Sequence, residues 1–120
     1  MKLRIEKDSL RLRLKQNEVA SLLADGIVEC SIRFSHRRQL RYSVASSPVA
    51  AVVSVNYRDG AIRVVLPHAI AIAWAESTEI AVEGAASDGV HILVEKDFRC
   101  LHKPAESDLE AYPNPMLLRK

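Results

Sequence analysis

A chain of 120 residues with 48% hydrophobic content lies in the range of a single domain and can bury one continuous core. No apolar run approaches the ~20 residues that cross a bilayer, and the alternating start, Met1–Glu6, lacks the apolar stretch of a secretory signal. We therefore expect a cytoplasmic protein with no membrane partner. The two cysteines, Cys30 and Cys100, are too few for a disulfide framework and are expected to be thiols.

Charge is distributed unevenly along the chain. Residues 1–60 contain 11 Lys and Arg against 6 Asp and Glu, whereas residues 61–120 contain 6 against 9. A basic half and an acidic half predict either an anion-binding face or charge pairing between the halves, within one chain or between two chains.

Hydrophobic periodicity predicts eight strands and two helices in the order β-β-α-β-β-β-β-α-β-β. Runs with alternating apolar residues or many β-branched residues predict strands near 3–5, 10–14, 28–34, 40–44, 49–57, 61–66, 80–82 and 90–94. Helical spacing of apolar residues predicts short helices near 19–23 and 70–75.

Turn and cap residues delimit these elements. Asn17 is available as the N-cap of the first helix, and Gly26 is suited to end it. Asp59-Gly60 is a strong signal for a hairpin turn. Pro67 ends a strand and suits the first turn of the second helix, which Trp74 is expected to anchor in the core.

The predominance of hairpins over helices favours an α+β fold. We expect a mainly antiparallel sheet of about seven or eight strands, with two short helices on one face and a partly closed barrel as the alternative. Residues 1–103 are expected to form a single domain. Strand parity predicts six buried residues in particular: Leu12, Ile32, Val53, Val64, Ile92 and Val94.

Residues 104–120 are expected to form an extended, proline-containing, acidic C-terminal tail. The tail is too apolar to remain in solvent, so we expect it to pack on the domain or on a second copy in a homodimer. Its carboxylates, Glu106, Asp108 and Glu110, are expected to lie against a cationic face.

Two parts of the chain carry a resemblance. They are Met1–Ile5 with Ser9–Leu14, and Leu93–Leu101 with Tyr112–Pro115. In these stretches the chain resembles a family of short, uncharacterised bacterial proteins, and the resemblance spans nearly its whole length. It implies a self-contained domain. Because the family has no assigned activity, the resemblance implies no role for individual residues.

A cationic face is the first candidate site. Arg4, Arg11, Arg13 and Lys15 fall on the polar side of the first predicted hairpin, and arginines on a sheet face can bind phosphates or carboxylates through bidentate hydrogen bonds. Three more arginines extend this face if their strands are neighbours: Arg33, Arg41 and Arg63. An ordinary solvated face is the simpler interpretation. Nucleic acid is not favoured, because stacking aromatic residues are missing from this side.

A possible metal site is the second candidate. Glu95, Asp97, Cys100 and His102 are the ligand types that a divalent metal such as zinc accepts. Paired Cys-x-x-Cys or His-x-x-x-His elements are missing, so the simpler interpretation is that Glu95 and Asp97 pair with arginines while Cys100 lies in the core.

The sequence contains neither a nucleophile elbow of the G-x-S-x-G type nor a glycine-rich phosphate loop, and we assign no catalytic residue. We therefore expect a non-enzymatic binding or interaction domain that recognises an anionic ligand or protein through a basic sheet face and needs no cofactor. The alternative is a metal-binding or metal-dependent protein that uses the segment from Glu95 to His102 and a divalent metal.

Overall fold

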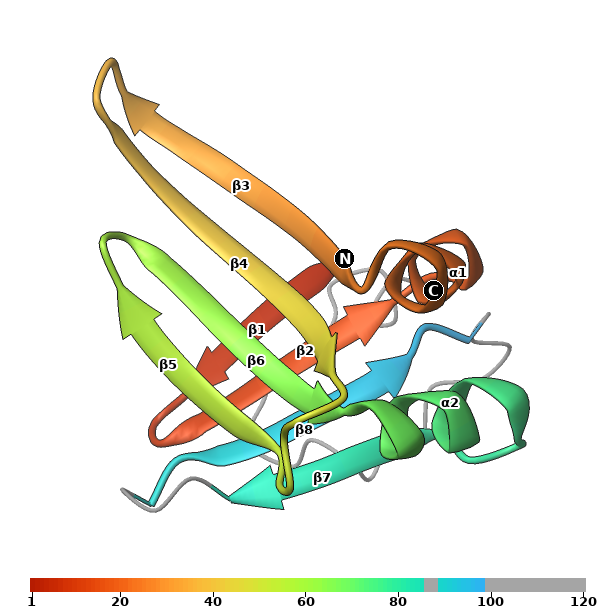
Figure 1. The fold of residues 1–120 in the computed structure, drawn as a ribbon. Coiled ribbons are helices and arrows are strands. Elements are labelled where there is room, and N and C mark those ends of the chain that lie inside the picture. The colour runs from red at the N-terminus through yellow and green to blue at the C-terminus, as the bar shows by residue number, and fades with distance from the viewer. Residues whose placement is uncertain (86–88, 99–120) are drawn as a thin grey trace, which may run out of the picture.

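The structure is a computed structural model that describes residues 1–85 and 89–98 (Figure 1). The described chain forms eight strands and two helices in the predicted order. Their bounds are β1 Lys2–Glu6, β2 Ser9–Leu14, α1 Gln16–Asp25, β3 Ile27–Ser35, β4 Arg38–Ser47, β5 Ser54–Arg58, β6 Ala61–Pro67, α2 His68–Glu76, β7 Ala81–Ala85 and β8 His91–Lys96.

The strands form two four-stranded sheets. Sheet A has the order β1-β2-β8-β7, and sheet B has the order β3-β4-β6-β5. Each sheet joins two antiparallel hairpins through a parallel pair of inner strands, which is β2 with β8 in sheet A and β4 with β6 in sheet B. The α+β class and most of the antiparallel pairing are thus confirmed, whereas the two central pairs are parallel and the sheets do not close into a barrel.

The topology is that of one β-β-α-β-β unit present twice. Exchanging β1, β2, α1, β3 and β4 with β5, β6, α2, β7 and β8 converts the strand order of one sheet into that of the other. Backbone hydrogen bonds follow the same exchange. The N–H of Arg41 donates to the Gly60 carbonyl at 2.9 Å, and the N–H of His91 donates to the Asp8 carbonyl at 2.7 Å. Residues 1–47 and 54–96 are therefore structurally equivalent halves.

The register shows which residues correspond. Val44 lies opposite Val64 between β4 and β6, and Val94 lies opposite Leu12 between β8 and β2. All four side chains are buried, so strand parity faces the core in the same way in both halves. The sequences of the two halves share this parity more than they share residue identity, which is why the sequence shows no repeat of fixed period.

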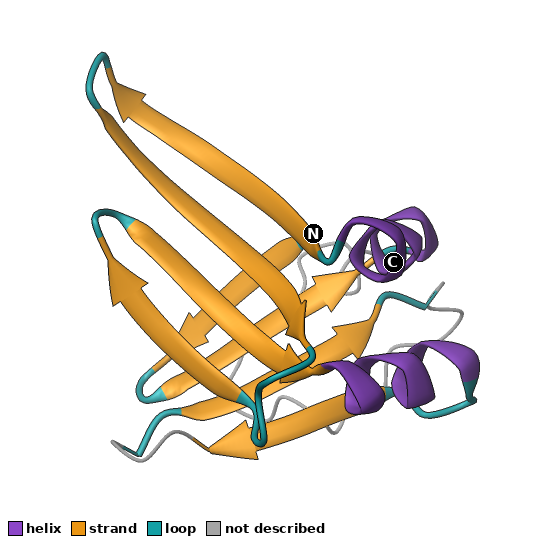
Figure 2. Cartoon of the chain, viewed as in Figure 1, coloured by secondary structure: helices purple, strands orange, loops and turns teal. Residues whose placement is uncertain are grey.

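The core lies between the sheets and the helices, and both helices cover the same end of the molecule while the hairpin turns lie at the other end (Figure 2). Burial of each large aliphatic side chain contributes roughly 1.5–3 kcal/mol. The core residues are Leu12, Leu14, Leu22, Val44, Val53, Val64, Leu66, Ala71, Trp74, Val82, Ile92 and Val94. Five of the six predicted core residues and Trp74 are among them.

The prediction for Ile32 is wrong, because 48% of its surface is exposed. Ile32 has the inward parity of β3 and pairs with Leu40 of β4. The β3–β4 hairpin extends beyond Ala61, where β6 begins, so at the row of Ile32 and Leu40 sheet B contains only β3 and β4. Parity predicted the correct face of the strand, but the apolar face of the hairpin extends beyond the core.

Two local expectations are also corrected. The strand expected from residue 49 begins at Ser54, which pairs with Val65 of β6, so residues 49–53 do not belong to it. The N-cap of α1 is Lys15 rather than Asn17, since the Glu18 carboxylate accepts a 2.9 Å hydrogen bond from the Lys15 N–H. Gly26 ends the helix with φ 81°, as predicted.

The predicted tail, residues 104–120, lies outside the described part of the chain. Within the described residues, no helix combines the length and the apolar character needed to cross a membrane.

Candidate anion-binding pocket

The predicted cationic residues Arg11 and Arg13 lie on the outer face of sheet A and pair with one carboxylate. Arg13 lies opposite Glu95 in the parallel β2–β8 pair, and its Nε and Nη2 donate to Glu95 Oε1 at 3.1 and 3.0 Å. Arg11 Nε lies 3.6 Å from the same oxygen. In the neighbouring strand β1, Arg4 Nη2 lies 3.8 Å from Glu6 Oε2. The positive charge on this face is therefore largely compensated within the chain.

The same register brings the two predicted sites together. Glu95 and Asp97, which were candidate metal ligands, lie beside the predicted cationic residues, and Asp97 is 3.7 Å from the Lys2 amine. Cys100 and His102 lie outside the described residues. Across residues 1–85 and 89–98, His, Cys, Asp and Glu side chains do not gather in groups of three or more that could hold a metal ion.

The suggested extension of the cationic face is not formed. The three arginines concerned are in β3, β4 and β6 of sheet B, whereas Arg4, Arg11 and Arg13 are in sheet A. The three are Arg33, Arg41 and Arg63. The molecule thus has two separate groups of arginines rather than one continuous face.

A pocket of about 960 Å³ lies where β2 and β8 end and the two helices meet. Both strands run parallel toward this end, and β2 leads directly into α1, so the amino end of α1 lies at the pocket. Apolar side chains form much of its wall: Val19, Ala20, Leu23, Ala75 and Phe98. Polar side chains form the remainder: Lys15, Gln16, Asn17, Ser77, Lys96 and Asp97.

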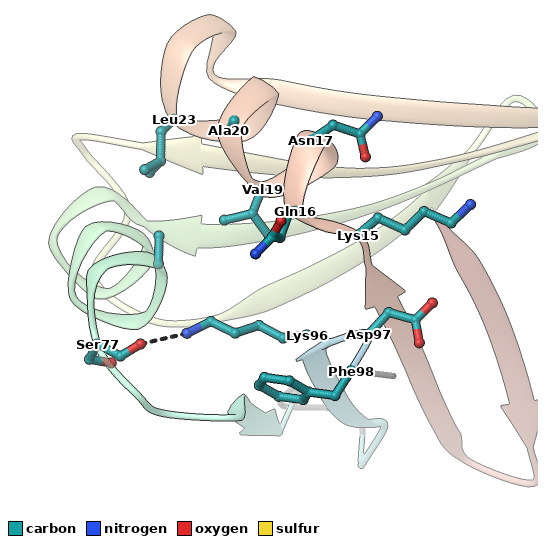
Figure 3. A pocket seen from close by; sticks show the side chains of 11 residues that line it. Lys15, Gln16, Asn17, Val19, Ala20, Leu23, Ser77, Lys96, Asp97 and Phe98 are labelled. Carbon is teal, nitrogen blue, oxygen red and sulfur yellow. Dashed lines mark hydrogen bonds between the residues drawn. The ribbon is translucent and has the colours of Figure 1, made fainter. Parts of the chain in front are cut away.

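Lys96 is the central polar group of this pocket. Its side chain reaches across the pocket toward the end of α2, with Val19 on one side and Phe98 on the other (Figure 3). Its Nζ donates to the Ser77 carbonyl at 2.7 Å and lies 5.8 Å from the centroid of the Trp74 ring. A lysine ammonium has three donors. Among the described residues no carboxylate lies at ion-pair distance from it, so its other two donors have no hydrogen-bond acceptor there.

Lys15 and Asp97 lie near the rim. Figure 3 shows the Lys15 amine and the Asp97 carboxylate pointing away from the Lys96 amine. Asp97 pairs with Lys2, which is not among the residues that line the pocket. The charge inside the pocket is therefore positive, and the positive end of the α1 dipole adds to it.

Glu18, in the first turn of α1, does not compensate this charge. Its carboxylate accepts hydrogen bonds from the Lys15 N–H and from the Met1 ammonium. Burial acts to raise the pKa of Glu18, but the Lys15 hydrogen bond and the Met1 ammonium together outweigh it, so the pKa lies below its ordinary value of 4.5. Glu18 is therefore ionised and is used to fix the start of the helix.

Sequence reasoning identified Lys15 and Asp97 but missed Lys96. The signal was present, because Lys96 continues the inward parity of Ile92 and Val94 in β8. A lysine on the apolar side of a strand end is unusual, since lysine is rarely buried without a partner. The pocket itself depends on the contact between α1 and α2, which the sequence pattern does not predict.

The fold and this site define a duplicated α+β domain with a positively charged pocket at the strand ends of sheet A. The chain belongs to the family of unknown function DUF7009, whose profile matches residues 1–116. No curated protein matches the chain, and no solved structure matches it.

Proposed function

We propose that the protein is a non-enzymatic binding domain that holds an anionic ligand with an apolar body in the pocket between α1 and α2. The anionic group would be a carboxylate or a phosphate bound by the Lys96 ammonium. The apolar body would lie against Val19, Leu23 and Phe98. A volume of about 960 Å³ is in the range of pockets that bind small molecules.

The observation that supports this proposal is the incomplete pairing of Lys96. The half-buried Lys96 side chain makes one hydrogen bond to a carbonyl, so its ammonium has donors to spare, and apolar side chains line part of the pocket around it. A ligand anion would supply the missing acceptor. The predicted cationic residues Arg11 and Arg13 contribute less, because Glu95 already pairs with both.

The chemistry of the lining residues supports binding rather than catalysis. The described side chains around the pocket include two amines, one carboxylate, amides and a hydroxyl. Asp97, the carboxylate, pairs with Lys2 and points away from Lys96, so these residues do not form a nucleophile and base pair.

Calorimetric titration with sodium octanoate tests the proposal. Octanoate is expected to bind one site, whereas octylammonium, which has the same chain and the opposite charge, should not bind. The Lys96→Met variant keeps the apolar stem and removes the charge. It should weaken octanoate binding about 10- to 100-fold, the loss of one charge-assisted hydrogen bond of ~1.5–3 kcal/mol.

Lys7→Met is the matched control, because Lys7 lies in the β1–β2 turn at the end remote from the helices. It should leave octanoate affinity unchanged. Equal affinity of the unaltered protein and Lys96→Met, or equal binding of octanoate and octylammonium, would contradict the proposal.

The metal-binding alternative stays a prediction, with Glu95, Asp97, Cys100 and His102 as its ligands. Elemental analysis of protein purified without an affinity tag tests it. Stoichiometric zinc, manganese or iron would replace the anion-binding proposal, whereas substoichiometric traces would leave the alternative without support.

A further inference from the structure

The β3–β4 hairpin has no counterpart of equal length in the second half of the molecule. β3 and β4 have 9 and 10 residues, whereas the equivalent strands β7 and β8 have 5 and 6. Pairing between β4 and β6 begins at Arg41, so the hairpin beyond that residue pairs only with itself. It projects from the end of the molecule opposite the helices (Figure 1).

The inner face of this hairpin is apolar and continuous with the core. In sheet B, Tyr42 lies opposite buried Ile62, which in turn lies opposite Tyr57. Ile32 and Leu40 form the next row toward the tip. Tyr57 is 70% exposed and Ile32 is 48% exposed, so the apolar row continues beyond the point where the core ends. Such an exposed face indicates a surface that is covered in the working molecule.

The same region is basic and lacks acidic residues. Residues 30–58 contain five arginines but no Lys, Asp or Glu. Arg37 and Arg38 lie at the tip of the hairpin, are exposed, and have no carboxylate at ion-pair distance among the described residues. Arg58 is also exposed but lies on the face of β5 opposite to Tyr57. The surface that covers this face is therefore expected to combine apolar side chains with carboxylates.

We infer that residues 104–118 of the same chain cover the inner face of the β3–β4 hairpin. This segment contains three carboxylates, no Lys or Arg, and apolar residues between and after them. The carboxylates are Glu106, Asp108 and Glu110, and the apolar residues include Leu109, Tyr112, Met116, Leu117 and Leu118. The segment therefore matches both the apolar and the basic character of the exposed face. This inference does not depend on which ligand the pocket binds.

The length of the chain permits this arrangement. β8 runs from the turn end of the molecule to the helix end, and Phe98 follows it by two residues. Six extended residues, 99–104, span about 20 Å, which is about the length of β8. Residue 104 can therefore lie most of the way back along β8, and residues 105–118 supply the remaining length to the turn end, where Tyr57 lies. The hydrophobic contacts supply most of the stabilisation, and the ion pairs fix the location.

Photo-crosslinking of the full chain tests the inference. The crosslinker p-benzoylphenylalanine replaces Tyr57, which is exposed and aromatic, so the fold should be preserved. After irradiation, mass spectrometry is expected to find intramolecular products that join position 57 to residues 104–118. The control places the crosslinker at Asn56, whose side chain lies on the opposite face of β5 and should give at least several-fold less of this product.

Charge is tested separately in the full chain with crosslinker at position 57. The combined substitution Glu106→Gln, Asp108→Asn and Glu110→Gln should reduce the yield several-fold at low salt. An unchanged yield would overturn the role of the arginines. Products that join two copies, products outside residues 104–118, or equal yields from positions 56 and 57 would overturn the assignment of this occupant.

Discussion

Each sheet contains one pair of parallel strands that ends near the helices. These two strand ends have the same backbone arrangement but different side chains. In the first, β2 and β8 end at Lys15, Lys96 and Asp97; in the second, β6 and β4 end at the equivalent Pro67, Ser46 and Ser47. The backbone frames match, since Lys96 N donates to the Ile80 carbonyl at 3.0 Å and Ser46 N donates to the Gly26 carbonyl at 2.9 Å. The pocket charge is thus a property of the strand end of sheet A alone.

At the strand end of sheet B, a polar side chain has a hydrogen-bond partner close by. Ser46 Oγ lies 3.4 Å from His68 Nδ1, and the ring of Pro67 occupies the position that Lys15 occupies in the first half. At the strand end of sheet A, Lys96 instead extends into a pocket and makes one hydrogen bond to a carbonyl. The comparison shows that the duplicated fold requires burial at equivalent positions but not charge. Charge that the fold does not require is the best indication of function in this molecule.

The largest expected effects test whether the halves share one core. Leu22 of α1 and Trp74 of α2 occupy equivalent positions, and both are fully buried. Trp74→Ala should lower the free energy of unfolding by about 3–5 kcal/mol and Leu22→Ala by about 2–5 kcal/mol, because each leaves a cavity. Denaturant unfolding measures both. Unfolding in two steps, with only one step shifted by each variant, would show that the halves unfold separately.

A smaller effect tests where the halves differ in packing. Cys30 and Gly84 are equivalent, but a Cβ at Gly84 would lie 2.6 Å from Val53 Cβ. Gly84→Ala should therefore destabilise the protein by about 1–3 kcal/mol through overpacking. Cys30→Ala keeps the Cβ and should cost less. A Gly84→Ala protein with the original denaturant midpoint would show that β7 is not held against Val53.

The smallest effect concerns the start of α1, where only the first half has a carboxylate in the first turn. The pKa of Glu18 is lowered in the folded protein, so its contribution to stability is present above the unfolded value and is lost as pH falls through the folded value. Glu18→Gln should weaken the loss of stability below about pH 4.5. Thermal unfolding from pH 7 to pH 3 measures it, and identical acid profiles would contradict the assigned contacts.

Much of the fold follows from local pattern. Alternation or β-branched runs predicted each of the eight strands, although β5 begins later than expected, and Gly26 and Asp59-Gly60 ended or turned the chain where expected. The pairing of distant hairpins could not be predicted, because parity specifies which face of a strand is buried and not which strand lies beside it. Ile32 illustrates the same limit, since its parity is correct but its position lies beyond the edge of the core.

The candidate site was predictable in part. Lys15 and Asp97 were recognised as functional types, and the pairing of Glu95 with arginines was the simpler of the two interpretations. Lys96 was hidden because its importance depends on α1 and α2 meeting beyond the strand ends. A lysine at inward parity becomes informative only when the pocket around it is known.

The central claim is that only one of the two equivalent strand ends binds an anion. Amide NMR of the isotope-labelled full chain, titrated with sodium octanoate, tests it most directly. We predict saturable shifts at Val19 and Lys96, with none at the equivalent Ala71 and Ser46. Equal shifts at Lys96 and Ser46, or shifts that do not saturate at either, would contradict it.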